Sequence, residues 1–207
     1  SITAGYAIED TTGKDSPEGT FTNNYLSYAA ITARHYDAKY KCICRSGIGI
    51  TVSWIPQIMP EIYDRLNPLD LNSKWNLSAD EPDIVVVNLF QNDTWLVNLP
   101  EHKEFKKRFG TKAPSEKKII NAYQQIIGNL RNHYPKADII YTLGSMDAAK
   151  EGSKWKEYIK IAVANLDDKK MHTHFMPYLK SKGHPTINDQ QTMAKSLIEF
   201  IDNNIEW

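Results

Sequence analysis

Residues 83–93 read Asp-Ile-Val-Val-Val-Asn-Leu-Phe-Gln-Asn-Asp. The run from Ile84 to Val87 is the longest purely aliphatic stretch of the chain. A continuous apolar strand is typical of a parallel sheet that is covered on both faces. The polar residues Asn92 and Asp93 then follow the carboxyl end of this strand, which is where open α/β sheets bind ligands.

Helix and strand patterns alternate along the rest of the chain. The clearest helix covers residues 115–134, where apolar side chains recur at helical spacing and Pro135 follows. Further helices are predicted at 24–38, around 155–166 and at 186–205, and a short one at 61–66; strands are predicted at 39–45, 83–89, 137–143 and 171–176. Strands separated by helices of this length predict an α/β fold, a three-layer α/β/α sandwich with a flavodoxin-like parallel sheet.

Composition excludes several classes of protein before any motif is considered. The chain has 207 residues, of which 41% are hydrophobic, and its 25 basic and 25 acidic residues give a formal charge of zero. A neutral chain lacks the charge expected of a nucleic-acid binder, so no nucleic-acid partner is predicted. Four aliphatic residues cannot span a bilayer, so no membrane partner is predicted either. A single domain, residues 1–207, is expected.

Cysteine and histidine do not predict a metal site. Cys42 and Cys44 are too close in sequence for an easy disulfide and have no second pair for zinc, so they are interpreted as small buried hydrophobic residues. Placed on a strand, both would point to one face. His172 and His174 alternate on a predicted strand without a nearby third ligand, which favours packing over metal binding. No cofactor is predicted.

Four short blocks occur in order along the chain. They are Ser-Ile-Thr-Ala-Gly-Tyr at residues 1–6, Ser-Gly-Ile-Gly at 46–49, Asn-Leu-Phe-Gln-Asn-Asp at 88–93 and Gly-His-Pro at 183–185. With these blocks the sequence resembles the SGNH (GDSL-type) hydrolase superfamily, and more narrowly the acetyl esterases of carbohydrate esterase family two. The resemblance covers the whole chain.

The resemblance implies a role for one residue of each block. Ser1 matches the nucleophile, Gly47 a backbone N–H donor, Asn92 a side-chain donor and His184 the general base. The chemistry is consistent, because a serine hydroxyl needs a base to take its proton, and an imidazole titrates near neutral pH. The oxyanion hole would consist of the Ser1 N–H, the Gly47 N–H and the Asn92 amide.

Two positions in or near the blocks depart from the family pattern. Phe90 stands where the third block usually has glycine, and we expect its bulk to reshape the pocket wall. Ser181 replaces the aspartate that usually precedes the histidine by three residues, which leaves a Ser–His dyad steered by a backbone carbonyl, as in some members of the esterase family. Asp93 and Asp189 are weaker candidates for the missing carboxylate.

A third departure concerns the start of the sequence. The family's serine follows a strand that ends in Gly-Asp, and that strand lies at the centre of the sheet. We therefore expect the sequence to be part of a longer chain, or an upstream segment to complete the sheet, because a missing central strand exposes unpaired backbone groups. The resemblance to the esterase family also implies an upstream β-sandwich domain. A literal N-terminal Ser1 leaves N-terminal nucleophile chemistry open as an alternative, although the alternating pattern disfavours it.

The resemblance implies an enzyme that removes acetyl or other short acyl groups from the hydroxyls of oligosaccharides or polysaccharides. Trp54 and Trp95 follow the glycine and asparagine blocks, so they are the candidate sugar-stacking residues, with core packing as the alternative. Polysaccharide substrates imply an extracytoplasmic location, although no signal peptide is visible. A lipid or thioester hydrolase, a non-catalytic carbohydrate-binding derivative and an interaction domain are the competing functions.

Overall fold

The computed structural model describes residues 1–12, 15, 19–79, 81–181 and 183–206. The chain divides into two compact units. The first consists of Ser1–Ser46, Leu143–Ser153 and His174–Trp207, and the second of Gly47–Thr142 and Lys154–Thr173. Among the described residues, no helix has the length and apolar character needed to cross a membrane.

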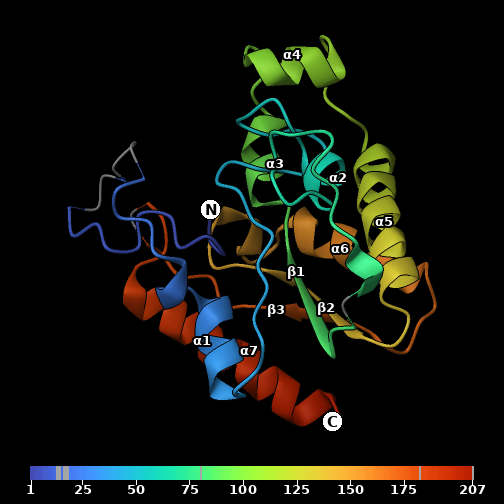
Figure 1. The fold of residues 1–207 in the computed structure, drawn as a ribbon. Coiled ribbons are helices and arrows are strands. Elements are labelled where there is room, and N and C mark those ends of the chain that lie inside the picture. Colours follow the sequence, from blue (N-terminus) through green and yellow to red (C-terminus); the bar gives the residue numbers. More distant parts are fainter. Residues whose placement is uncertain (13–14, 16–18, 80, 182, 207) are drawn as a thin grey trace. The chain divides into compact units, whose positions relative to one another are not determined.

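Helices and strands alternate, and the strands form one sheet in the order β1-β2-β3 (Figure 1). The strands are β1 (Ile84–Asn88), β2 (Asp138–Leu143) and β3 (Met171–Phe175). The α-helices are α1 (Tyr28–His35), α2 (Met59–Ile62), α3 (Gln91–Leu96), α4 (Lys103–Phe109), α5 (Glu116–His133), α6 (Lys154–Ala164) and α7 (Ile187–Asn204). Short 3-10 turns cover Asn24–Leu26, Leu77–Ala79 and Asp147–Ala149. Strands β1 and β2 run parallel, with Ile84 opposite Asp138, so the predicted α/β class is confirmed.

The core of the second unit is built from β2 and α5. Ile139, Ile140 and Tyr141 of β2 have no exposed surface, as expected for the middle strand of a parallel sheet. Helix α5 packs against α6 and buries the apolar stripe predicted for residues 115–134. Strand β1 differs from its prediction, because Val87 is its one buried residue. It is an edge strand in the order β1-β2-β3, so fewer neighbours cover its side chains.

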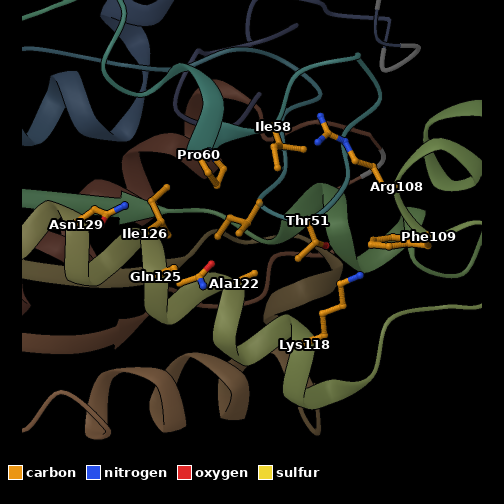
Figure 2. A pocket seen from close by; sticks show the side chains of 11 residues that line it. Thr51, Ile58, Pro60, Arg108, Phe109, Lys118, Ala122, Gln125, Ile126 and Asn129 are labelled. Carbon is orange, nitrogen blue, oxygen red and sulfur yellow. The ribbon is translucent and has the colours of Figure 1, made fainter.

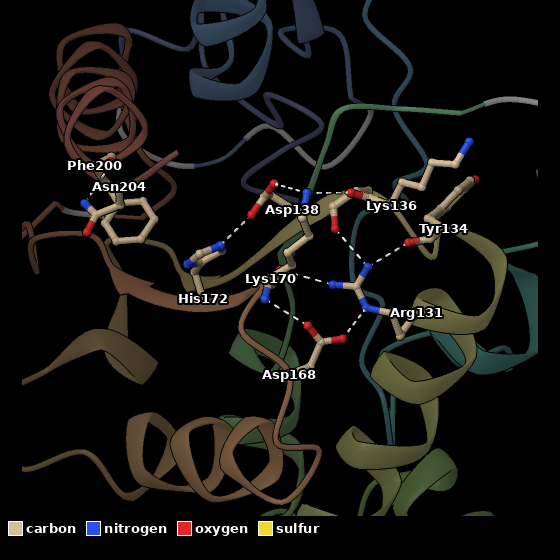
Figure 3. Close-up of polar contacts among 10 residues, drawn as sticks. Arg131, Tyr134, Lys136, Asp138, Asp168, Lys170, His172, Phe200 and Asn204 are labelled. Carbon is tan, nitrogen blue, oxygen red and sulfur yellow. Dashed lines mark hydrogen bonds and ion pairs between the residues drawn. The ribbon is translucent and has the colours of Figure 1, made fainter. Parts of the chain in front are cut away.

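Arg131 joins the ends of three elements in the second unit (Figure 3). Its guanidinium donates to the carbonyl oxygens of Tyr134 and Ala137, both at 2.8 Å, and to that of Lys170 at 3.1 Å. Its Nε lies 2.8 Å from Asp168 Oδ2. Five donors in a rigid fork allow one arginine to satisfy several carbonyls at once. The residue therefore fixes the end of α5 against the starts of β2 and β3.

Neither histidine of β3 takes part in a metal cluster. His172 Nε2 lies 2.8 Å from Asp138 Oδ1 on the neighbouring strand (Figure 3). In the first unit, His174 Nε2 lies 3.0 Å from Ser196 Oγ, and its ring stacks on Phe200 at 4.7 Å between centroids. Among the described residues, no group of three histidine, cysteine or carboxylate side chains could hold an ion.

In the first unit, α1 packs against α7, and Gln190 links the two helices to the first residues of the chain. Its Oε1 accepts from the Tyr28 backbone N–H at 2.8 Å, and its Nε2 donates to the Ile2 carbonyl at 3.1 Å. A capping box of Thr186 and Asp189 begins α7. The predicted helix 24–38 is shorter than expected, because Ser27 caps a new helix by accepting from the Ala30 N–H.

Three local predictions are wrong in position or state, and two short helices were not predicted. Residues 39–45 are all described and form no strand, since a strand needs a ladder partner and they have none among the described residues. The helix expected at 61–66 occurs at Met59–Ile62, and α3 and α4 were not predicted. Cys42 is exposed and Cys44 partly exposed, so they are not buried hydrophobic residues. Their sulfur atoms lie 3.3 Å apart, although the segment forms no strand.

Phe90 does not form a pocket wall; it lies in the core of the second unit. It has no exposed surface, and its ring contacts Tyr123 and Trp155 at centroid distances of 4.6 and 4.9 Å. Its φ of 86° is left-handed, a conformation that costs an L-residue roughly 1–2 kcal/mol. Glycine takes this conformation freely, so here the packing of an aromatic ring offsets backbone strain.

We expect Phe90→Gly to be less destabilising than Phe90→Ala, although it removes one more carbon. Both variants lose the buried ring, which costs about 3–5 kcal/mol for alanine. Glycine in addition relieves the left-handed strain, so its free energy of unfolding should exceed that of the alanine variant by roughly 1 kcal/mol. Urea unfolding of both variants measures this. A glycine variant less stable than the alanine variant would show that residue 90 is not strained.

Candidate active site

His184 pairs with Asp15 in the first unit. Its Nδ1 lies 2.9 Å from Asp15 Oδ2, and its backbone N–H donates to Asp15 Oδ1 at 3.1 Å. The two side chains are 18% and 29% exposed. Since a carboxylate accepts, Nδ1 carries the proton and Nε2 is left to accept another. This is the arrangement in which an imidazole can act as a general base.

Gly183 allows the carboxylate to approach the histidine. Its φ is 92°, which a residue with a Cβ rarely adopts. A Cβ at this position would lie 2.8 Å from Asp15 Oδ2, closer than a Cβ contact allows. The glycine of the fourth block is therefore required both by its torsion angle and by the space that Asp15 occupies.

Asp15 was not among the carboxylates proposed from the sequence, and the expectation of steering by a backbone carbonyl alone was wrong. It is 169 residues from His184 along the chain, so no local spacing points to it. Asp189 instead accepts from Ser181 Oγ at 2.8 Å and from the Thr186 backbone N–H at 2.9 Å, so it caps α7. Asp93 has other partners in the second unit.

Burial lowers the pKa of His184 below the ordinary imidazole value of 6.5. The hydrogen bond and the charge of Asp15 oppose this shift, because both favour the imidazolium. The ring of Tyr6 lies 4.8 Å from the imidazole and contributes to its burial. The imidazole is therefore neutral at neutral pH and available to accept a proton.

Ser1 lies in the same unit as His184 and is partly buried. The Ser1 nitrogen lies within electrostatic range of the His184 ring. The Ser1 carbonyl accepts from the Tyr6 N–H at 3.2 Å. Gly5 (φ 69°) lies against the Asn23 carbonyl, where a Cβ would collide. The first block thus forms a turn, which Gln190 holds against α7.

The glycine and asparagine blocks come together in the second unit. Asn92 is 6% exposed, and its Nδ2 donates to the Ile48 carbonyl at 2.6 Å. The amide nitrogen carries two hydrogens, so this bond fixes its orientation and leaves the second hydrogen for another acceptor. Gly47 has a φ of 80°, and its carbonyl accepts from the Trp54 N–H at 2.9 Å. The Asn92 side chain is therefore packed against the loop that carries Gly47.

Asp93 anchors the loop that carries Gly47. Its carboxylate has no exposed surface and accepts from the Ile50 N–H at 2.9 Å, the Thr51 N–H at 2.7 Å and the Thr51 hydroxyl at 2.6 Å. Burial raises the pKa of Asp93, while these donors oppose the shift. Gly49 lies against this carboxylate, where a Cβ would collide with it. The last residue of the third block is thus the anchor of the second block.

The two tryptophans predicted as sugar platforms differ in exposure. Trp54 is 40% exposed and lies beside Gly47, with its ring edge-on to His102 at 5.2 Å. Trp95 is on α3 and is only partly exposed. Asn92 is also on α3, because the left-handed Phe90 begins that helix shortly after β1. Trp54 is therefore the better placed of the two to stack against a sugar.

Comparison with known proteins finds relatives whose names agree with one another. No family model matches the chain. The cellulase/esterase CelE of Acetivibrio thermocellus is 30% identical over 219 residues, which are 100% of this chain and 25% of CelE. An acetylxylan esterase / glucomannan deacetylase of Cellvibrio japonicus is 23% identical over 215 residues, which are 100% of this chain and 56% of that protein. The chain therefore spans a quarter to about half of the length of these relatives.

Solved structures agree with this result. A family two carbohydrate esterase from Clostridium thermocellum, solved in complex with cellohexaose, is 29% identical with a TM-score of 0.80, over 98% of this chain and 61% of that one. A GDSL-like lipase from Bacteroides ovatus shares the fold at 15% identity and a TM-score of 0.53, over 88% of this chain and 81% of that one.

We expect Asp15→Asn to lower the pKa of His184 further. The substitution keeps the shape of the side chain and removes the negative charge that favours the imidazolium. Titration of the histidine ring signals by NMR measures the pKa in both proteins, with Asp202→Asn as a control in the same unit. An unchanged or higher His184 pKa in Asp15→Asn, with the ring signals otherwise preserved, would mean that the carboxylate does not act on the imidazole.

Proposed function

Because this chain is a relative of the carbohydrate esterases of family two and has the fold of the SGNH hydrolases, we propose that it is a carboxylic ester hydrolase that removes acetyl groups from carbohydrate hydroxyls. The observation that carries the proposal is the His184–Asp15 pair at 2.9 Å, with Ser1 in the same unit. The names of the relatives, which are esterases and deacetylases of polysaccharides, support the same reaction class.

The proposed mechanism assigns one step to each group. The Ser1 hydroxyl attacks the acetyl carbonyl, and His184 Nε2 takes the hydroxyl proton. Asp15 accepts from Nδ1, keeps the productive tautomer and stabilises the imidazolium, as the carboxylate does in serine hydrolase triads. The sugar hydroxyl leaves with the proton from His184. Water then attacks the acetyl-serine through the same base and releases acetate.

The proposed oxyanion hole consists of the Ser1 N–H, the Gly47 N–H and one Asn92 amide hydrogen. The bond of Asn92 to the Ile48 carbonyl and the anchoring of the loop by Asp93 support this role. Donors that are already fixed need no reorganisation when charge develops on the carbonyl oxygen.

We further propose oligosaccharide or polysaccharide substrates and, with them, an extracytoplasmic location. The exposed ring of Trp54 beside Gly47 supports a sugar ligand, since aromatic faces pack on the apolar faces of sugars. An upstream β-sandwich domain is part of the same proposal. Non-catalytic glycan binding is the second candidate function, and the same exposed Trp54 favours it.

Hydrolysis of p-nitrophenyl acetate tests the catalytic proposal. Ser1→Ala is expected to abolish turnover, and His184→Ala to reduce it roughly 10²- to 10⁴-fold. Asn92→Ala should cost roughly 10²- to 10³-fold, through loss of one oxyanion donor. His35→Ala, at an exposed histidine of the same unit, is the matched control. Full activity of both Ser1→Ala and His184→Ala would contradict the proposal, and glycan binding without any turnover would favour the second candidate.

The pH profile of kcat/KM tests the base separately. The imidazole must be neutral to accept a proton, so activity should be high above the His184 pKa and fall as pH drops through it. Because burial lowers that pKa, the midpoint of the acid limb should lie below 6.5. Asp15→Asn should move the midpoint lower still. Steady-state assays over a range of pH measure it, and a flat profile from about pH 5 to pH 8 would exclude a histidine base.

The substrate is tested by measuring acetate release from acetylated xylan, glucomannan and pectin fragments. Preference for acetylated sugars over p-nitrophenyl esters of longer acyl chains is the expected result. The opposite preference would favour the lipid or thioester hydrolase alternative.

A further inference from the structure

A cavity of about 320 Å³ lies in the second unit, beside the loop that carries Gly47 (Figure 2). One wall is a single face of α5, on which Lys118, Ala122, Gln125 and Asn129 follow one another at helical spacing. The small side chain of Ala122 leaves room in the middle of this face. The volume of the cavity is at the lower end of the range for ligand pockets, about 300–1,000 Å³.

The opposite side of the cavity is apolar and rigid. Phe109 at the end of α4 and the pair Ile58 and Pro60 line it. Arg108 holds this wall in place, because its guanidinium binds both oxygens of Glu61, at 2.7 and 3.0 Å, and the Pro56 carbonyl at 2.7 Å. Arg108 is therefore neutralised, and its role here is structural.

Lys118 supplies an uncompensated positive charge. Its Nζ lies 5.5 Å from the centre of the Phe109 ring, over the aromatic wall of the cavity. Among the described residues, no carboxylate forms an ion pair with it. Asp93, behind Thr51, is fully buried and bonded to the loop amides, so it does not open into the cavity.

The surroundings of the cavity are basic although the whole chain is neutral. Residues 101–118 contain seven lysines and arginines against three glutamates, whereas the chain as a whole has 25 of each sign. Two of the three glutamates, Glu101 and Glu116, pair with lysines. The exposed lysines with no ion pair among the described residues are Lys103, Lys107, Lys112, Lys117 and Lys118. Charge of this kind favours and steers an anionic ligand.

From this combination we propose that the cavity is a binding subsite for a uronic acid residue of an acidic polysaccharide. The carboxylate of the sugar pairs with Lys118, and the apolar ring face packs on Phe109. The hydroxyls bond to the amide of Gln125 and to the remaining donor and acceptor sites of Asn129, whose side chain also bonds to Tyr63. A simple anion such as phosphate would leave the aromatic wall and the two amides unused. The proposal deepens the proposed function, on which it rests for the polysaccharide nature of the ligand.

Calorimetric titration of the full chain tests the subsite with two probes of equal length: a xylo-oligosaccharide that bears one glucuronic acid, and the neutral xylo-oligosaccharide. The acidic probe should bind about fivefold more tightly, and the difference should shrink as salt is added, because the pair is solvent-exposed. Lys118→Ala should abolish the preference and Lys118→Arg should keep it. Lys195→Ala, at an exposed lysine of α7, should change nothing.

Each outcome decides the proposal. Equal affinity for the two probes, or an unchanged preference in Lys118→Ala, would overturn it. Equal affinity for a single-stranded oligonucleotide would also overturn it, by showing a basic surface without sugar recognition. All variants should keep wild-type hydrolysis of p-nitrophenyl acetate, because Lys118 has no role in the proposed chemistry. Tighter binding of the acidic probe without hydrolysis of p-nitrophenyl acetate would reject the proposed function alone. Hydrolysis without tighter binding of the acidic probe would reject the subsite alone.

Discussion

A buried carboxylate, that of Asp93, organises the second unit around the start of α3. It collects the backbone N–H groups of Ile50 and Thr51 and the Thr51 hydroxyl at distances of 2.6 to 2.9 Å. An ion without exposed surface is tolerable only when such donors replace water. The shape of the Gly47–Trp54 loop follows from this requirement. The orientation of the Asn92 side chain against this loop and the position of Thr51 in the cavity wall follow from it as well.

The parts of the fold that the sequence predicts are those in which one segment determines its own structure. Helix α5 repeats its apolar residues on one face, and the helix was predicted correctly from that pattern; Ser115 caps it. The capping box of α7 is equally local. The strand predicted at residues 39–45 does not form, because a strand requires a second segment to pair with. The apolar pattern of one segment does not reveal whether such a partner is present. Short helices such as α3 and α4 have too few turns to show a period.

The candidate site divides in the same way. Ser1, Gly47, Asn92 and His184 could be proposed from the sequence because each lies in a short block, whereas Asp15 could not, because no short-range pattern near His184 indicates it. Only the folded chain brings a carboxylate and an imidazole from opposite ends of the sequence to 2.9 Å. Burial, which sets the direction of the His184 pKa, is likewise invisible in the order of the residues.

Phe90 has a consequence for how such chains are recognised. What the site needs at this position is a left-handed residue that turns the chain from β1 directly into α3, with the amide and carboxylate of the next turn facing the glycine loop. Glycine is the usual solution, but an aromatic ring anchored in the core serves as well. A signature written in amino-acid letters passes over chains of this kind, whereas one written in backbone torsion angles retains them.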